Sequence, residues 1–167
     1  EALGTTVLGT ERLAADLAAH LGAGAPTRIV SLKRLPGGFS RETVALEAAV
    51  GEETHALIMR RQRSGGLLDT AGLTIAQEFP VLRLVYDGGV PVAEPLWVEP
   101  DGSVLGAPYA VSRRVNGTVL GTAVGGSGID REHLRALAEV MAQIHALPWE
   151  EDSPTLLAAL GLSIAPA

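Results

Sequence analysis

The chain contains no cysteine among its 167 residues, which excludes disulfide bonds and thiolate metal sites. It is also short of basic residues, because 13 Lys and Arg stand against 19 Asp and Glu, a formal net charge of −6 at pH 7. Nucleic-acid and anionic-membrane surfaces need a basic field, so this balance argues against both kinds of partner. It leaves room for one local basic pocket.

Long apolar runs are absent as well. The most apolar stretch, residues 158–167, is too short to span a bilayer, and the start of the chain lacks the pattern of a signal peptide. We therefore expect a cytoplasmic protein with no membrane partner. The chain begins with Glu1 rather than Met, and we expect it to start inside a longer gene product. Its 47% of hydrophobic residues are enough to build a core for one domain or two small lobes.

The N-terminal half of the sequence predicts one helix and then an antiparallel meander. Residues 10–22 have the pattern of an amphipathic helix that Thr10 caps and Gly22 ends. The apolar face of this helix consists of Leu13, Leu17 and Leu21. Three runs with strand-like alternation and short connections follow at residues 27–35, 42–50 and 54–62. In the second run, one face is apolar: Val44, Leu46, Ala48 and Val50.

The C-terminal half predicts two more helices and two more strands. Residues 73–89 have apolar side chains at helical spacing around Pro80, which is expected to kink the helix or to mark a short turn before it. Two strands are expected within residues 91–115, joined by a turn. After a glycine-rich linker, residues 129–149 form the clearest helix, which Asp130 caps. One face of this helix is apolar: Leu134, Leu137, Met141 and Ile144.

Three features of the sequence suit phosphate binding. The loop 37–40, Gly-Gly-Phe-Ser, can bring backbone N–H groups close to an anion, although two glycines in a hairpin also make an ordinary turn. Arg60 shares a strand face with Ile58 and can hold phosphate oxygens in two hydrogen bonds, or can simply be exposed. Glu78 on the next helix would orient Arg60 and balance its charge, or would be a solvated surface residue.

The predicted elements make an α+β architecture, a five-stranded antiparallel sheet with one inserted helix, flanked by an N-terminal helix and a C-terminal linker helix. Their order resembles the small lobe of a protein kinase. Five segments resemble the aminoglycoside phosphotransferase family, which includes choline-kinase-like small-molecule kinases: LPGGFSRET, LIMRRQ, QEFPVLRLV, GVPVAEPLWVEPDGSVLGAPYAVSRRVNG and LAEVMAQIHALP. The resemblance extends from Ile29 to Pro148.

The resemblance implies a nucleotide site. Its positions in this chain would be Gly37, Gly38, Phe39, Ser40, Ile58, Arg60, Glu78, Ser112, Arg113 and Arg114. The loop would cover the ATP phosphates, and Ile58 would pack on adenine. Arg60 would take the place of the phosphate-contacting lysine, with Glu78 as its ion-pair partner. The last three residues would form the hinge, whose backbone hydrogen-bonds adenine.

Three positions depart from the family pattern. Arg60 stands where the aminoglycoside enzymes usually have lysine, which favours the choline-kinase-like branch over antibiotic resistance. Ser112 and Arg113 stand where the hinge usually has Met and Glu. The details of adenine recognition are therefore expected to differ from those of the aminoglycoside enzymes.

The family's catalytic motif, His-x-Asp-x-x-x-x-Asn, does not occur in this chain. In the family, that loop and a later Asp supply the carboxylate near the acceptor hydroxyl and the Mg²⁺ ligands, so no catalytic or metal-binding residue is assigned here. We expect an N-terminal helix at residues 1–25, an ATP-binding small lobe at residues 26–117, and a linker with the first helix of a second lobe at residues 118–167. The expected function is the nucleotide-binding lobe of an ATP- and Mg²⁺-dependent phosphotransferase acting on a small-molecule hydroxyl, inactive as this fragment alone.

Other possibilities stay open at this point. The chain can also be a non-catalytic binding module or a degenerate kinase fragment, and the sequence determines neither the acceptor nor the choice between ATP and GTP. A lone small lobe would expose the apolar face that meets a second lobe, so it is expected to self-associate or to be marginally stable. Four further side chains are expected to be structural or solvated: Trp97 and Trp149 packed, His145 half-buried in a packing role, and Asp16 a solvated charge.

Overall fold

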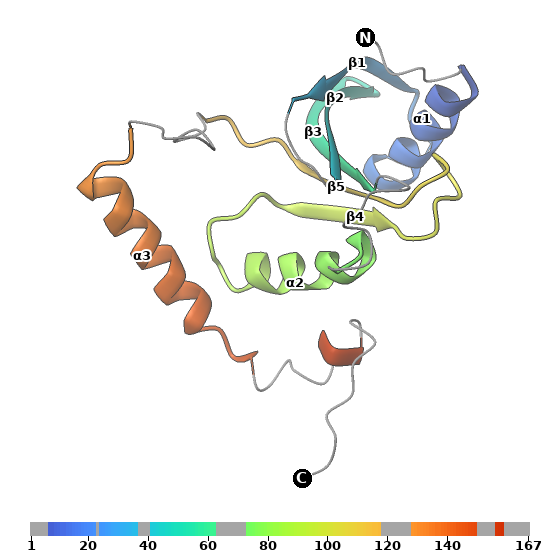
Figure 1. Ribbon diagram of the computed structural model, residues 1–167. Helices are drawn as coiled ribbons and strands as arrows, with labels where there is room; N and C mark the ends of the chain where they lie inside the picture. The colour runs from blue at the N-terminus through green and yellow to red at the C-terminus, as the bar shows by residue number, and fades with distance from the viewer. Residues whose placement is uncertain are drawn as a thin grey trace.

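The computed structural model describes residues 7–22, 24–36, 41–62, 73–117, 128–149 and 156–158. Its elements, drawn in Figure 1, are α1 (Val7–Leu21), β1 (Thr27–Leu35), β2 (Arg41–Val50), β3 (Glu53–Gln62), α2 (Ile75–Asp87), β4 (Pro95–Glu99), β5 (Tyr109–Arg113) and α3 (Arg131–His145). The predicted α+β architecture is confirmed. One boundary was wrong: α1 already includes Val7, so Thr10 lies inside the helix and is not its cap.

The five strands form one antiparallel sheet in the order β1-β2-β3-β5-β4. The first three strands are neighbours both in sequence and in space. Gly51 adopts a φ of 60° in the turn between β2 and β3, a conformation that favours glycine. β5 inserts between β3 and β4, so β3 and β5 lie side by side within the sheet.

One face of the sheet packs against α1 and forms the main core. Strand alternation points the predicted apolar face of β2 inward, and Val44, Leu46 and Ala48 are fully buried. Leu13 and Leu17 of α1 meet this face and are buried as predicted. The core is completed by buried residues of three other strands: Leu57, Met59, Trp97, Tyr109 and Val111.

A polar contact crosses the same interface between α1 and the sheet. Oδ2 of Asp16 accepts hydrogen bonds from the Trp97 indole at 3.0 Å and from the Tyr109 hydroxyl. His20 stacks on the Trp97 ring with the centroids 4.5 Å apart. The expectation that Asp16 is a solvated charge was therefore wrong, because residues far away in sequence supply its donors. The expectation that Trp97 packs in the core is confirmed.

Helix α2 lies on the other face of the sheet, against β3, β4 and β5 (Figure 1). It begins with a capping box in which the Thr74 side chain accepts from the Gln77 backbone and the Gln77 side chain accepts from the Thr74 backbone. Pro80 lies inside the continuous helix, so it does not mark a separate turn before it. Glu78 falls in the first turn, where the helix dipole favours a negative charge.

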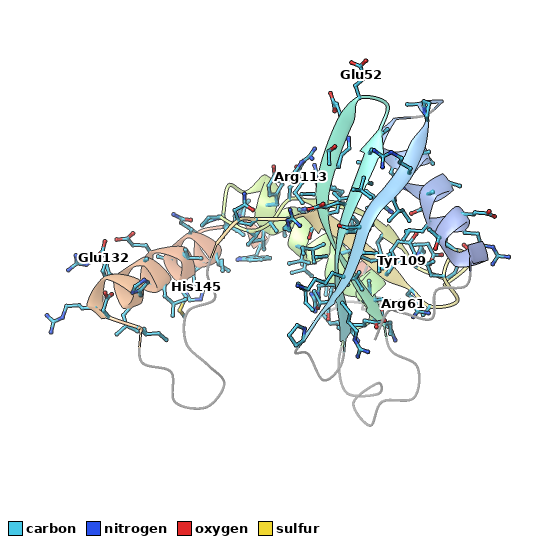
Figure 2. All side chains as sticks on the ribbon, turned by 90° about the horizontal axis from the view of Figure 1, so that it is seen from above. Glu52, Arg61, Tyr109, Arg113, Glu132 and His145 are labelled. Carbon is cyan, nitrogen blue, oxygen red and sulfur yellow. The ribbon has the colours of Figure 1, made fainter. Side chains whose placement is uncertain are left out.

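Helix α3 extends away from the sheet (Figures 1 and 2). Asp130 caps it as predicted, and the backbone N–H of His133 lowers the pKa of that carboxyl group. Its C-terminal end packs on the lobe through buried Leu147, which meets Val85 and Val90. Trp149 packs beside them, but His145 is exposed rather than half-buried. No helix in the described part of the chain is both long enough and apolar enough to cross a membrane.

Candidate functional site

The candidate site lies between α2 and the centre of the sheet. Arg60 points toward this side of β3, opposite to the buried Met59, as the alternation predicted. The strand register places Ala110 of β5 beside Arg60, and Ser112 beside Ile58. Arg60, Ala110 and Ser112 form the sheet side of the site, because they share the face that α2 covers.

Arg60 and Glu78 form the ion pair that the sequence predicted. Nη1 of Arg60 lies 3.4 Å from Oε2 of Glu78, which α2 brings onto the same face. The side chain of Arg60 is 44% exposed and that of Glu78 is 29% exposed, so both are at the rim of the site rather than in the core. Arg60 is thus held in place while part of its guanidinium remains open to a ligand.

A second arginine contacts the same carboxylate. Nη2 of Arg41 donates to Oε1 of Glu78 at 3.1 Å and also to the backbone carbonyl of Leu73. Each oxygen of Glu78 therefore faces a different arginine. Sequence reasoning missed Arg41. The strand register shows why it belongs here, because Arg41 and Thr43 share a face of β2 and Thr43 pairs with Arg60.

A pocket opens beside this ion pair. Its lining is mostly apolar and comes from α2, β3, β4 and β5: Arg60, Ile75, Glu78, Phe79, Leu82, Pro95, Ala110, Val111 and Ser112. Its volume is about 40 Å³, far below the roughly 300–1,000 Å³ of a site that encloses a ligand. The described residues therefore form one wall of a site, with a cation at the edge of an apolar surface.

On the opposite face of the sheet, outside this pocket, another glutamate also lies between two arginines. Glu42 lies between Arg34 at 3.3 Å and Arg61 at 3.5 Å, and Arg61 also donates to the backbone carbonyl of Leu105 at 2.7 Å. Arg61 pairs with Tyr109 in the sheet register, and Figure 2 labels the two on the α1 side. This cluster joins β1, β2 and β3 on the face that packs against α1.

The predicted hinge residues separate into two groups. Ser112 lines the pocket. Arg113 and Arg114 do not: their backbone N–H groups donate to the carbonyls of Glu94 and Ala56, and their side chains pair with Glu94 and Glu47. Figure 2 shows Arg113 at the opposite end of β5 from Tyr109. Ile58 shares the face of Arg60 without lining the pocket.

Four predicted site residues, Gly37, Gly38, Phe39 and Ser40, lie outside the described residues, so their role stays a prediction. Metal sites, too, can be assessed only among the described residues. Within the described ranges, no three His, Cys, Asp or Glu side chains are grouped so that they could hold a metal ion. Glu78 in particular directs both of its oxygens toward arginines.

Most of the chain matches one known protein family. Residues 31–162 match the family model described as the phosphotransferase enzyme family. The chain belongs to the phosphotransferase enzyme family. The matched segment begins within β1 and includes Arg41, Arg60 and Glu78.

The chain is also similar to one solved structure and to two curated proteins. The crystal structure of a "putative aminoglycoside phosphotransferase" from Ralstonia eutropha superposes with a TM-score of 0.57 at 23% identity, covering 85% of this chain and 39% of the other. This likeness shows the fold of the small lobe. The chain is also 29% identical over 125 residues to acyl-CoA dehydrogenase family member 11 of Gallus gallus. It is 30% identical over 140 residues to the Mus musculus protein of that name. It spans only 15% and 17% of their lengths.

Proposed function

We propose that this chain is the nucleotide-binding lobe of an ATP-dependent phosphotransferase that acts on a small-molecule hydroxyl. The observation that carries the proposal is the Arg60–Glu78 ion pair at the edge of an apolar pocket, in a chain of the phosphotransferase family. A triphosphate nucleotide needs both surfaces, because its phosphates are anionic and its base is flat and largely apolar.

Arg60 is suited to hold phosphate oxygens. Its planar guanidinium presents several N–H donors, and phosphate accepts them in pairs. Glu78 pairs with one nitrogen of the guanidinium and fixes the direction of the group. Because the Arg60 side chain is partly exposed, its other N–H donors are within reach of a ligand. Enzymes catalyse phosphoryl transfer mainly by positioning and by stabilising charge, so a cation held in this way is a functional part and not only a surface residue.

The apolar wall fits the nucleotide base. Phe79 and Leu82 of α2 face Ala110 of β5 across the pocket, and Ser112 adds a polar group at the same place. Among the three predicted hinge residues we assign the base contact to Ser112, because Arg113 and Arg114 do not line the pocket. The loop 37–40, which precedes β2, would cover the phosphates.

ATP would supply the phosphoryl group, and the described residues fit it as one wall of its site. They do not fit Mg²⁺, because the carboxylate nearest the pocket is taken by two arginines. The chain also lacks the His-x-Asp-x-x-x-x-Asn motif. We therefore place the acceptor-activating carboxylate and the metal ligands outside these residues.

The acceptor is a matter for screening. Two relatives carry the name acyl-CoA dehydrogenase family member 11, and the matched segment is a small part of each. Their name gives hydroxylated acyl thioesters as the first class to test, with amino alcohols, sugars and aminoglycosides as the comparison set. GTP should be tested beside ATP.

The test of this function is nucleotide-dependent phosphorylation by the complete gene product, with Arg60→Ala as the variant. A lost charge-assisted hydrogen bond costs about 1.5–3 kcal/mol, so we expect kcat/KM for ATP to fall roughly 10- to 150-fold. Arg28→Ala is the control, because Arg28 is exposed and lies near the start of β1, the end away from the loop 37–40. Binding of ATP without transfer to any acceptor would favour a degenerate kinase, and absence of binding would favour a non-catalytic module.

A further inference from the structure

Arg41 connects the start of β2 to the start of α2. It is the first residue of β2, directly after the loop 37–40. Its guanidinium donates to the carbonyl of Leu73, the residue before the helix cap, and to Glu78 in the first turn of the helix. The side chain is only 11% exposed, so this connection lies beneath the surface of the site. Arg41 therefore sets where the N-terminal end of α2 lies relative to the sheet.

Glu78 is shared between a buried and an exposed arginine. Its Oε1 faces Arg41 at 3.1 Å and its Oε2 faces Arg60 at 3.4 Å. With one oxygen held by Arg41, the carboxylate has a fixed orientation from which to hold Arg60. The direction of Arg60 at the pocket thus depends on a residue that does not itself line the pocket.

The third charge also gives the otherwise neutral cluster a net positive charge. Arg60 and Glu78 alone have no net charge, so their attraction for a polyanion is weak at a distance. Arg41 brings the sum of the three side chains to +1. Because charges in a partly buried setting are screened less than exposed ones, this charge acts on the pocket without direct contact.

We propose that Arg41 is a positioning residue for phosphate binding, which holds Glu78 and the start of α2 so that Arg60 is directed at the nucleotide phosphates. This inference rests on the proposed nucleotide-binding function and extends it to the residue that follows the predicted phosphate loop. It gives the chain a means to set the position of α2, the helix whose placement controls the ion pair in kinase-like sites.

The experiment compares two ligands that differ only in phosphate. The affinities of the complete gene product for MgATP and for adenosine are measured by competition calorimetry in the wild type and in Arg41→Gln, Arg41→Lys and Arg60→Ala. We expect Arg41→Gln to weaken MgATP binding roughly 10- to 100-fold and adenosine binding less than about 3-fold. Arg41→Lys should restore part of the MgATP affinity, because lysine keeps the charge but lacks the planar fork.

Arg34→Gln is the matched control. It makes the same substitution near the same end of the sheet, but Arg34 pairs with Glu42 on the face opposite to the pocket. Equal losses in Arg34→Gln and Arg41→Gln would overturn the proposal, and so would equal weakening of MgATP and adenosine by Arg41→Gln. If Arg41→Gln does not fold, as judged by circular dichroism, Arg41→Lys decides: an unchanged ratio of MgATP to adenosine affinity would overturn the proposal.

The outcomes separate this inference from the function on which it rests. If the wild type does not bind MgATP, the proposed function is wrong and Arg41 has no phosphate to position. If the wild type binds MgATP and Arg60→Ala weakens it while Arg41→Gln does not, only the role of Arg41 is overturned. A loss in both variants, with adenosine binding kept, supports both.

Discussion

At the scale of single residues, Asp16 shows most clearly that a carboxylate removed from water depends on its hydrogen-bond donors. Its carboxylate sits between α1 and the sheet, and Trp97 and Tyr109 both donate to the same oxygen. A carboxylate that is removed from water needs such donors, because an unpaired buried charge is strongly destabilising. The attachment of α1 to the sheet therefore depends on hydroxyl and indole groups as well as on leucines.

The first stability prediction concerns the hydroxyl group of Tyr109, which is fully buried. Tyr109→Phe removes one donor to a charged acceptor, so the free energy of unfolding should fall by about 1.5–3 kcal/mol in denaturant titration at neutral pH. Tyr86→Phe is the control, because it makes the same chemical change on α2, away from Asp16. Equal stability of the two variants would contradict a role for the hydroxyl in holding α1.

Tyr109 should also make the free energy of unfolding depend on pH. Burial, and then the hydrogen bond to Asp16, raise the pKa of Tyr109 above its usual 10.0. The folded protein thus keeps a proton that the unfolded chain releases, and stability falls as pH rises above about 10. We expect this fall to be steeper in the wild type than in Tyr109→Phe, with Tyr86→Phe following the wild type. An identical slope in all three would mean that Tyr109 ionises as freely in the folded chain as in the unfolded one.

At the scale of elements, the contact between the segments that follow α2 and α3 depends on a glycine. Gly88 follows α2 with a φ of −75°, which any residue can adopt, but a Cβ atom there would lie 2.2 Å from Cδ2 of Leu147. Leu147 is the buried residue through which the end of α3 packs against Val85 and Val90. The absent side chain of Gly88 is therefore what lets α3 approach the lobe.

Gly88→Ala should loosen this contact. Overpacking of this kind costs about 1–3 kcal/mol, and the strain falls on Leu147, which can move away from the lobe. We expect faster amide hydrogen exchange near the C-terminal end of α3 and unchanged exchange in β2 and β3. Gly117→Ala is the control, since its Cβ would have nothing within 4 Å. If both variants exchanged like the wild type, the contact would tolerate the methyl group and the prediction would be wrong.

The elements themselves could be predicted because their signals are local. The apolar alternation from Val44 to Val50 and the turn at Gly51 fixed β2 and β3 to within a residue, and Asp130 marked the start of α3. The Arg60–Glu78 pair was one of two possibilities from the residues alone, and the family resemblance favoured it. It joins two elements, and no local pattern states which residues of a helix and a strand will meet.

The missed contacts all span long stretches of sequence. Asp16 and Tyr109 are 93 residues apart, and Arg41 and Glu78 are 37 apart. An acidic residue on a helix or an arginine at the start of a strand is usually solvated, so neither stands out until the fold supplies its partner. The order of strands, in which β5 inserts beside β3, is the information that the sequence pattern lacks.

At the scale of the whole molecule, α3 presents an apolar stripe that the described part of the lobe does not cover. Leu134 and Leu137 are each 56% exposed and Met141 is 49% exposed, at the helical spacing that puts all three on one face. Large apolar side chains gathered in this way favour association. Leu147, two residues after α3, packs against Val85 and Val90 of the lobe and does not cover this face.

We therefore expect the 167-residue chain to self-associate through α3, with a mass in sedimentation velocity that rises between roughly 10 μM and 1 mM. The double variant Leu134→Gln/Leu137→Gln should stay monomeric, with its melting temperature nearly unchanged because both side chains are already exposed. Arg135→Gln/Glu139→Gln is the control, since it alters the same helix, removes one charge of each sign and leaves the stripe intact. A wild-type chain that stays monomeric throughout would contradict the prediction, and association that persists equally in both double variants would place the contact on another surface.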